Sequence, residues 1–196
     1  PNSLSGFSTC AGTVSAAQTT SVSGTGLSAN ITLTAPTGYE ISLSLASGYA
    51  STLTLTQSGG VVNATTIYVR LNSIATAGTY NANLTAVSGS NTTNIALAGV
   101  KIGNPTLTTN PTTTLEQYCY SNPNTTSSIT VATSAAPPTY QWQISSDNSN
   151  FSNVVNGTGG TATTYFPSHV DIMYGNTRYY RCIVTSACGS TTSNSK

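Results

Sequence analysis

Short runs in which every second residue is apolar constrain the fold of this chain more than any other feature. Residues 41–45, 53–55 and 67–71 are three such runs. A period of two sends alternate side chains to opposite faces of a β-strand, one toward a core and one toward water. Ser and Thr fill most of the alternate positions, and the β-branch of Thr suits a pleated backbone. The pattern predicts an all-β chain and argues against disorder.

The first half of the chain holds seven strand candidates, which clusters of Gly, Pro, Asn or Ser separate. A spacing of roughly 8–12 residues is typical of β-sandwiches. The candidates are residues 19–23, 29–34, 39–45, 52–56, 65–71, 80–87 and 94–102. Pro105 and Pro111 then interrupt the pattern, because proline lacks a backbone donor. We predict a sandwich module over residues 1–102, a linker over 103–110 and a second module over 111–196.

Trp, Tyr and Cys in the second half have the spacing of an immunoglobulin-like (Ig-like) sandwich. In that fold a buried Trp lies on the third strand, and a Tyr two residues before a Cys marks the sixth. Trp142 lies in one alternating run, and Tyr180 precedes Cys182 in another. Val131 occupies the position that usually carries the second core Cys. These residues are the predicted core landmarks, and the predicted fold is two tandem Ig-like antiparallel β-sandwich domains.

The four cysteines permit three complete pairings, and the sequence alone does not choose among them. Because the first and last strands of many sandwiches lie close together, we expect Cys119 to pair with Cys188. Cys182 is then a buried thiol against Val131, and Cys10 is unpaired or bonded outside the chain. The alternative pairing joins Cys119 to Cys182. A disulfide indicates an oxidising compartment outside the cytoplasm.

The low charge of the chain excludes several classes of function. Charged residues make up 5% of the sequence, whereas about 25% is ordinary. Five Lys and Arg cannot form a basic surface for nucleic acid or for anionic membranes. Few groups are left for acid–base chemistry or metal ligation, so we expect no enzyme activity, cofactor or metal. The sequence also lacks an apolar run of the roughly 18 residues that a membrane span needs.

Two polar clusters have a chemical and a structural interpretation. His169 and Asp171 lie beside Ser168, but no Gly-x-Ser-x-Gly motif accompanies them, so we interpret the segment as a polar loop. Asp147 and Asn150 could offer oxygens to Ca²⁺. One carboxylate is too few for a cation that takes about six to eight oxygens, so we predict a turn there. A zinc site of Cys182, Cys188 and His169 lacks the usual tight cysteine spacing.

The remaining charged and aromatic residues also have two interpretations. Lys101, Glu40 and an Asn could nominally form an intramolecular Lys–Asn cross-link, but we expect Lys101 to be a solvated strand end. Arg70 is expected to point outward, with its stem over Tyr68. Aromatic residues could stack on sugar rings, although in a sandwich they are more often core. The candidates are Tyr140, Trp142, Tyr165, Tyr179 and Tyr180.

Most of the chain resembles a known family. Residues 4–18, 22–27, 35–40 and 66–71 resemble a β-sandwich repeat of large secreted and surface proteins of Bacteroidota. Residues 140–143, 180–182 and 187–190 resemble the Ig-like module often found beside such repeats. The resemblance implies an Ig-like fold and export by the Sec pathway followed by type IX secretion. It also implies that the last strand is only starting at Lys196, so that continuing chain or a neighbouring subunit completes it.

Two functions follow from these observations. The first is a non-catalytic structural or adhesive module of an extracellular, cell-surface protein or filament, whose partners are copies of itself or neighbouring domains of one long chain. Low charge favours it, because little self-repulsion opposes association. The second is a carbohydrate-binding accessory module that docks surface polysaccharide for a larger adhesin or enzyme. Neither function involves nucleic acid or membrane insertion.

Overall fold

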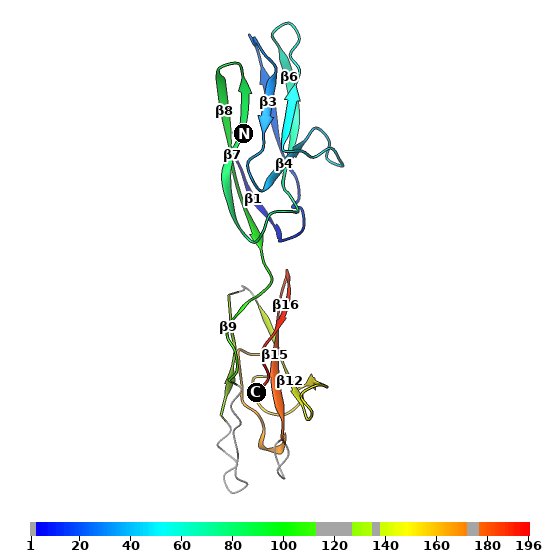
Figure 1. The fold of residues 1–196 in the computed structure, drawn as a ribbon, viewed down its shortest axis with the longest axis vertical. Helices are drawn as coiled ribbons and strands as arrows, with labels where there is room; N and C mark the ends of the chain where they lie inside the picture. Colours follow the sequence, from blue (N-terminus) through cyan, green and yellow to red (C-terminus); the bar gives the residue numbers. More distant parts are fainter. Residues whose placement is uncertain (1–2, 113–126, 135–137, 172–176) are drawn as a thin grey trace. The chain divides into compact units, whose positions relative to one another are not determined.

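The chain divides into two compact units, Pro1–Gly103 and Asn104–Lys196, and both are built from β-strands (Figure 1). The computed structural model describes residues 3–112, 127–134, 138–171 and 177–196. The first unit contains β1 (Ser3–Cys10), β2 (Gln18–Gly24), β3 (Ile31–Thr34), β4 (Tyr39–Ser42), β5 (Thr52–Leu55), β6 (Val62–Leu71), β7 (Gly78–Ser88) and β8 (Asn91–Ile102). The second contains β9 (Leu107–Thr109), β10 (Ile129–Thr130), β11 (Ala132–Thr133), β12 (Thr139–Ser145), β13 (Ser152–Asn153), β14 (Thr164–Tyr165), β15 (Tyr179–Ser186) and β16 (Gly189–Thr192). The all-β prediction is confirmed.

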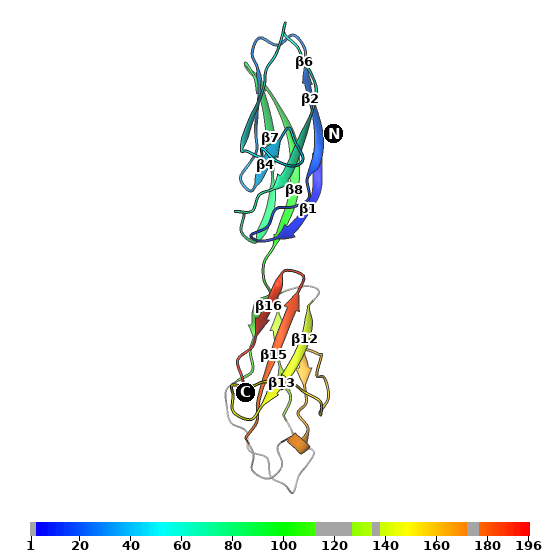
Figure 2. The same ribbon diagram turned by 90° about the vertical axis from the view of Figure 1, so that its right-hand side faces the viewer.

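Two sheets form the first unit, with strand orders β1-β8-β7-β3-β5 and β2-β6-β4. All seven strand candidates are present as β2 to β8. β1, which pairs with β8 in parallel (Figure 2), is not among the strands predicted from the sequence. Its alternation is broken at Gly6, where the backbone φ is 78° and the register with β8 shifts. Leu4 and Phe7 therefore both reach the core although they are three residues apart.

The core of the first unit lies between these sheets and takes alternate residues from each. Ile67, Val69 and Leu71 of β6 are fully buried, and Phe7 packs edge-on against Tyr39 with ring centroids 5.3 Å apart. Burial raises the pKa of Tyr39 to about 12. Gly99 makes this packing possible, since a Cβ atom there would lie 2.7 Å from the Tyr39 hydroxyl.

The second unit has the arrangement expected of an Ig-like sandwich. One sheet has the order β13-β12-β15-β16, and the two-stranded pairs β10-β14 and β11-β9 complete the described strands. Trp142 of β12 is the register partner of Cys182 of β15. Val131, between β10 and β11, lies in the same core cluster as both of them and Tyr180. The predicted core landmarks thus occupy one core, and the Ig-like fold class is confirmed.

Two features differ from the sequence analysis. Leu107–Thr109 lies inside the predicted linker, yet it forms β9 and pairs with β11, because a strand of three residues is too short to show a period. The expected lack of a last strand is wrong. β16 pairs with β15, and Tyr180 and Lys196 exchange backbone hydrogen bonds of 2.8 Å. The chain itself therefore supplies the strand beside β15.

Candidate binding surface

An arginine stacked on a tyrosine marks the outer face of β2-β6-β4 in the first unit. Arg70 of β6 lies opposite Glu40 of β4, and its Nε donates to Glu40 Oε1 at 2.7 Å. The guanidinium carbon lies 3.5 Å from the centre of the Tyr49 ring, which belongs to the segment between β4 and β5. Burial raises the pKa of Tyr49, and the positive charge of Arg70 opposes that rise.

Tyr68 lies two residues before Arg70 on β6, so both side chains point to the same face of the sheet. Arg70 points outward, as its position in the alternation predicts, and its side chain is 23% exposed. The contact with Tyr49 could not be predicted, because a contact between a loop and a strand has no signature in sequence spacing. The outer face here combines two phenol rings with an ion pair.

The second unit contains a related arrangement on β12 and β15. Arg181 stacks on Phe151 at 4.0 Å from the ring centre, and its Nε donates to Gln143 Oε1 at 2.9 Å. Gln143 Nε2 in turn donates to Asn153 Oδ1. Two of the three arginines of the chain are therefore held between a neighbouring strand and an aromatic ring.

The sugar-stacking candidates named from the sequence mostly belong to the core. Trp142 and Tyr165 are completely buried, and Tyr180 is 4% exposed. Trp142 stacks on Tyr165 at 5.8 Å, and its Nε1 donates to the Ala162 carbonyl. Only Tyr140 and Tyr179, which are half-buried, retain surface among these candidates. Of the five candidates, therefore, only Tyr140 and Tyr179 could offer part of a ring to a sugar.

The cysteines differ from the predicted arrangement. Cys10 and Cys188 are each disulfide-bonded, whereas Cys182 is a free, buried thiol. The expected pairing of Cys188 with Cys119, with Cys10 outside any bond in the chain, does not fit this arrangement. The alternative pairing of Cys119 with Cys182 is wrong, because Cys182 is a free thiol. Cys119 itself lies outside the described residues. Cys182 shares its core with Val131, and burial raises the pKa of its thiol to about 11.

The cysteines are therefore expected to react at different stages of unfolding. N-ethylmaleimide at pH 8 should leave Cys182 unlabelled in the native protein, because the thiol is buried and stays protonated. Denaturation alone should expose Cys182, and reduction should be required before Cys10 and Cys188 are labelled. Peptide mapping by mass spectrometry distinguishes the stages. Labelling of Cys182 in the native protein would contradict the buried position.

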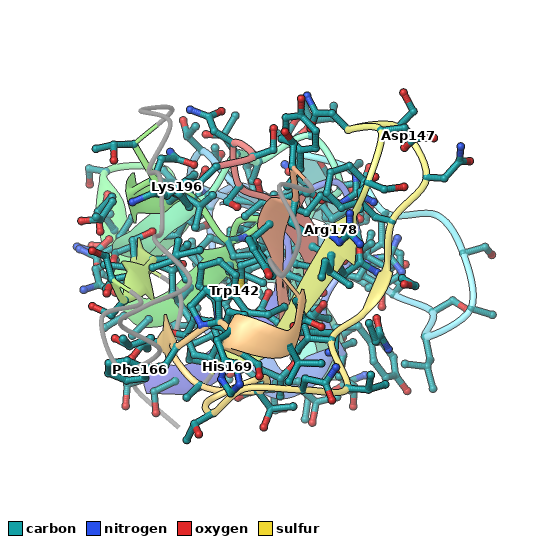
Figure 3. All side chains as sticks on the ribbon, turned by 90° about the horizontal axis from the view of Figure 1, so that it is seen from below. Trp142, Asp147, Phe166, His169, Arg178 and Lys196 are labelled. Carbon is teal, nitrogen blue, oxygen red and sulfur yellow. The ribbon has the colours of Figure 1, made fainter. Side chains whose placement is uncertain are left out.

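The polar clusters named from the sequence have structural partners. Asp171 Oδ1 accepts a hydrogen bond from Asn156 Nδ2 at 2.8 Å, and His169 is exposed. Asp147 accepts from the backbone N–H groups of Ser149 and Asn150, and these bonds hold the pKa of its carboxyl well below the usual range. Asp147 therefore organises a turn. His169 and Asp147 lie at opposite sides of the second unit in Figure 3.

In the described parts of the chain, no three His, Cys, Asp or Glu side chains gather in a way that could hold a metal ion. Within the same residues, no helix has the length and apolar character needed to cross a bilayer.

Lys101 is buried, contrary to the prediction of a solvated strand end. Its side chain is among the largest of those that are fully buried, and Nζ donates to the Thr13 carbonyl in the turn after β1. The alternation of β8 places Lys101 on the core face together with Leu97 and Gly99. Burial lowers the pKa of Lys101, and the nearby negative charge of Glu40 raises it. The ammonium group therefore holds the turn after β1 against the end of β8.

The buried lysine predicts a pH dependence of stability. Because its pKa is lower in the folded than in the unfolded chain, the unfolded chain binds more protons between the folded value and about 10.5. Stability due to Lys101 therefore rises with pH through that window. We expect the unfolding free energy of the wild type to increase relative to that of Lys101→Met between pH 7 and pH 10. Urea unfolding of both proteins measures this, and parallel pH curves would contradict it.

Comparisons with known proteins place the chain in a family. Residues 76–196, more than half of the chain, match a family described as "Domain of unknown function (DUF8696)", and the chain belongs to that family. The matched region contains β7, β8 and the whole second unit. No curated protein matches the chain.

Among solved structures, the chain is similar to tandem-domain proteins at low sequence identity. A chimeric titin Z1Z2-Z1Z2 tandem carrying a fibronectin GRGDS peptide is 16% identical over 96% of this chain and 92% of that chain, with a TM-score of 0.32. Titin domains z1z2 in complex with telethonin are 13% identical over 96% and 89%, with a TM-score of 0.31. The Ig1-2 module of the Drosophila receptor protein tyrosine phosphatase DLAR is 13% identical over 96% and 91%, with a TM-score of 0.28.

Proposed function

We propose that the chain is a non-catalytic structural and adhesive module of an extracellular cell-surface protein or filament. In this proposal its β-sandwich units associate, by their sheet edges or ends, with copies of the same chain or with neighbouring domains of a longer one. Two disulfide-bonded cysteines support an oxidising, extracellular location. The resemblance to secreted repeat modules of Bacteroidota supports a cell-surface origin.

The observation that carries this proposal is the composition of the edge strands. β1, β2, β5 and β16 lie at the edges of their sheets and contain neither a charged residue nor proline, whereas the edge strand β4 contains Glu40. Natural sheets commonly protect their edges with Lys, Pro or a covering segment, because an open edge pairs with other strands. Such edges can accept a strand from another chain, and a net charge of +1 opposes this association only weakly.

Blocking one edge tests the proposal. The purified chain is expected to associate as its concentration rises, in light scattering after size-exclusion chromatography and in electron micrographs. Thr54→Lys places a charge on the edge strand β5 and should weaken association. Asn83→Lys adds the same charge on β7, an interior strand of the same sheet, and should not. A wild-type chain that stays monomeric at all concentrations would contradict the proposal.

A second candidate function is that of a carbohydrate-binding accessory module of a larger secreted adhesin or enzyme. The arrangement of Tyr49, Tyr68 and Arg70 favours it, because aromatic rings beside hydrogen-bonding groups are what a sugar site requires. Retardation of the chain in native gels that contain soluble polysaccharide tests this function. Migration that is identical with and without every polysaccharide would contradict it.

A further inference from the structure

We propose that Tyr49, Tyr68, Arg70 and Glu40 form a binding site for a neutral polysaccharide on the outer face of β2-β6-β4. The inference rests on the second proposed function and gives it a location and a ligand class. The site belongs entirely to the first unit.

The four side chains are placed together by strand register and by one loop. Glu40 and Arg70 are directly opposite on β4 and β6, and Ser42 is opposite Tyr68 one step along the same face. Tyr49 comes from the segment after β4, where its hydroxyl donates to the Leu45 carbonyl. All four residues are partly exposed. A ligand can therefore reach the rings and the ion pair without any core residue moving.

Part of the hydrogen-bonding capacity of this cluster is not used by the described residues. Among the described residues, Arg70 donates a hydrogen bond only through Nε, so its two terminal amino groups are available to a ligand. Glu40 accepts only through Oε1, and the Tyr68 hydroxyl bonds to none of them. A sugar hydroxyl both donates and accepts, so this combination of donors and acceptors fits it. The phenol rings supply the apolar surface on which the C–H face of a pyranose packs.

The charge of the cluster determines the class of polysaccharide. The Glu40 carboxylate lies 2.7 Å from the Arg70 guanidinium, so the pair carries no net charge. A sulfated or uronic-acid polysaccharide would have to compete with Glu40 for Arg70 and would meet its negative charge. A neutral polysaccharide uses both members of the pair and leaves their hydrogen bond intact. Neutral glycans are therefore the expected ligands.

The related cluster of the second unit lacks these properties and provides a matched control. Both ends of the Gln143 amide are occupied, one by Arg181 and the other by Asn153. Phe151 has no hydroxyl, and no carboxylate balances Arg181 in the described contacts. Loss of the Phe151 ring thus removes a similar arginine–aromatic stack without removing a predicted sugar contact.

Affinity gel electrophoresis of the full chain tests the site. The probes are laminarin, hydroxyethylcellulose and galactomannan, with dextran sulfate as the anionic comparison. We expect at least one neutral polysaccharide to retard the wild type. Tyr68→Ala should weaken that binding about tenfold, as expected for loss of a stacking ring, and Arg70→Met should weaken it too. Phe151→Ala should bind as the wild type does, and the melting temperature of each variant establishes that it is folded.

The outcomes separate the site from the function. If a neutral polysaccharide binds and folded Tyr68→Ala and Arg70→Met bind it equally well, the site is wrong while carbohydrate binding stands. If no polysaccharide retards the chain, both the site and the carbohydrate function are wrong, and the structural function is untouched. Retardation by dextran sulfate alone overturns the assignment to neutral polysaccharides.

Discussion

Replacing Trp142 by Ala is expected to destabilise the second unit by about 3–5 kcal/mol, which is the usual loss for a buried Trp. The indole is completely buried, stacks on Tyr165 and donates to the Ala162 carbonyl. The substitution opens a cavity and leaves that carbonyl without its donor. A loss of this size is a large part of the stability of a small domain.

Differential scanning calorimetry measures the effect. The first unit has its own core, to which Trp142 does not belong, so its transition should keep the wild-type temperature while that of the second unit falls. Phe166→Ala is the control, because Phe166 is 48% exposed and its loss should change stability little. An unchanged second transition in Trp142→Ala would show that the indole is not a core residue.

Gly38→Ala is expected to destabilise the first unit by about 2–4 kcal/mol. The backbone φ at Gly38 is 89°, a region that L-residues rarely adopt, and a Cβ atom there would lie 2.2 Å from Cδ1 of the Tyr80 ring. The ring cannot easily move away. Its hydroxyl donates to the Thr76 carbonyl, and the Tyr80 carbonyl accepts from the Tyr39 hydroxyl.

Gly12→Ala separates the backbone cost from the steric clash. Gly12 has a similar φ of 83°, but a Cβ atom there would meet nothing within 4 Å. This variant should lose only the backbone contribution of about 1–2 kcal/mol. Urea unfolding of the three proteins gives both values. Equal losses of unfolding free energy in the two variants would mean that the Tyr80 ring moves aside without destabilising the fold.

The sequence predicted the fold well because burial on one face of a strand leaves a period of two. β2 to β8 and the core landmarks Trp142, Tyr180 and Val131 all lie in such runs. β1 was not predicted because a bulge at Gly6 shifts its register and breaks the alternation. β9 was not predicted because its three residues are too few to show a period. Strands could therefore not be predicted from local spacing where they are very short or where the backbone departs from regular pairing.

The candidate surface was harder to predict than the fold. Outward exposure of Arg70 follows from the alternation of β6, but its partners Glu40 and Tyr49 come from other segments of the chain. Lys101 was misplaced for a related reason. Its position in the alternation of β8 points inward, yet its charge suggested solvent, and the Thr13 carbonyl that accepts from it belongs to a distant turn. The partners of both side chains come from other segments of the chain, and sequence spacing does not show such contacts.

The parallel pairing of β1 with β8 has a mechanical consequence. Six register pairs join the two strands, from Ser3 with Ala96 to Cys10 with Ile102. Because the strands are parallel, Ser3 and Ile102 lie at opposite ends of this ladder. Tension that pulls these two residues apart acts along the strands and shears the whole ladder at once, whereas a hairpin pulled at its open end unzips one pair at a time. A force applied along the strands in this direction would therefore act on all six register pairs together.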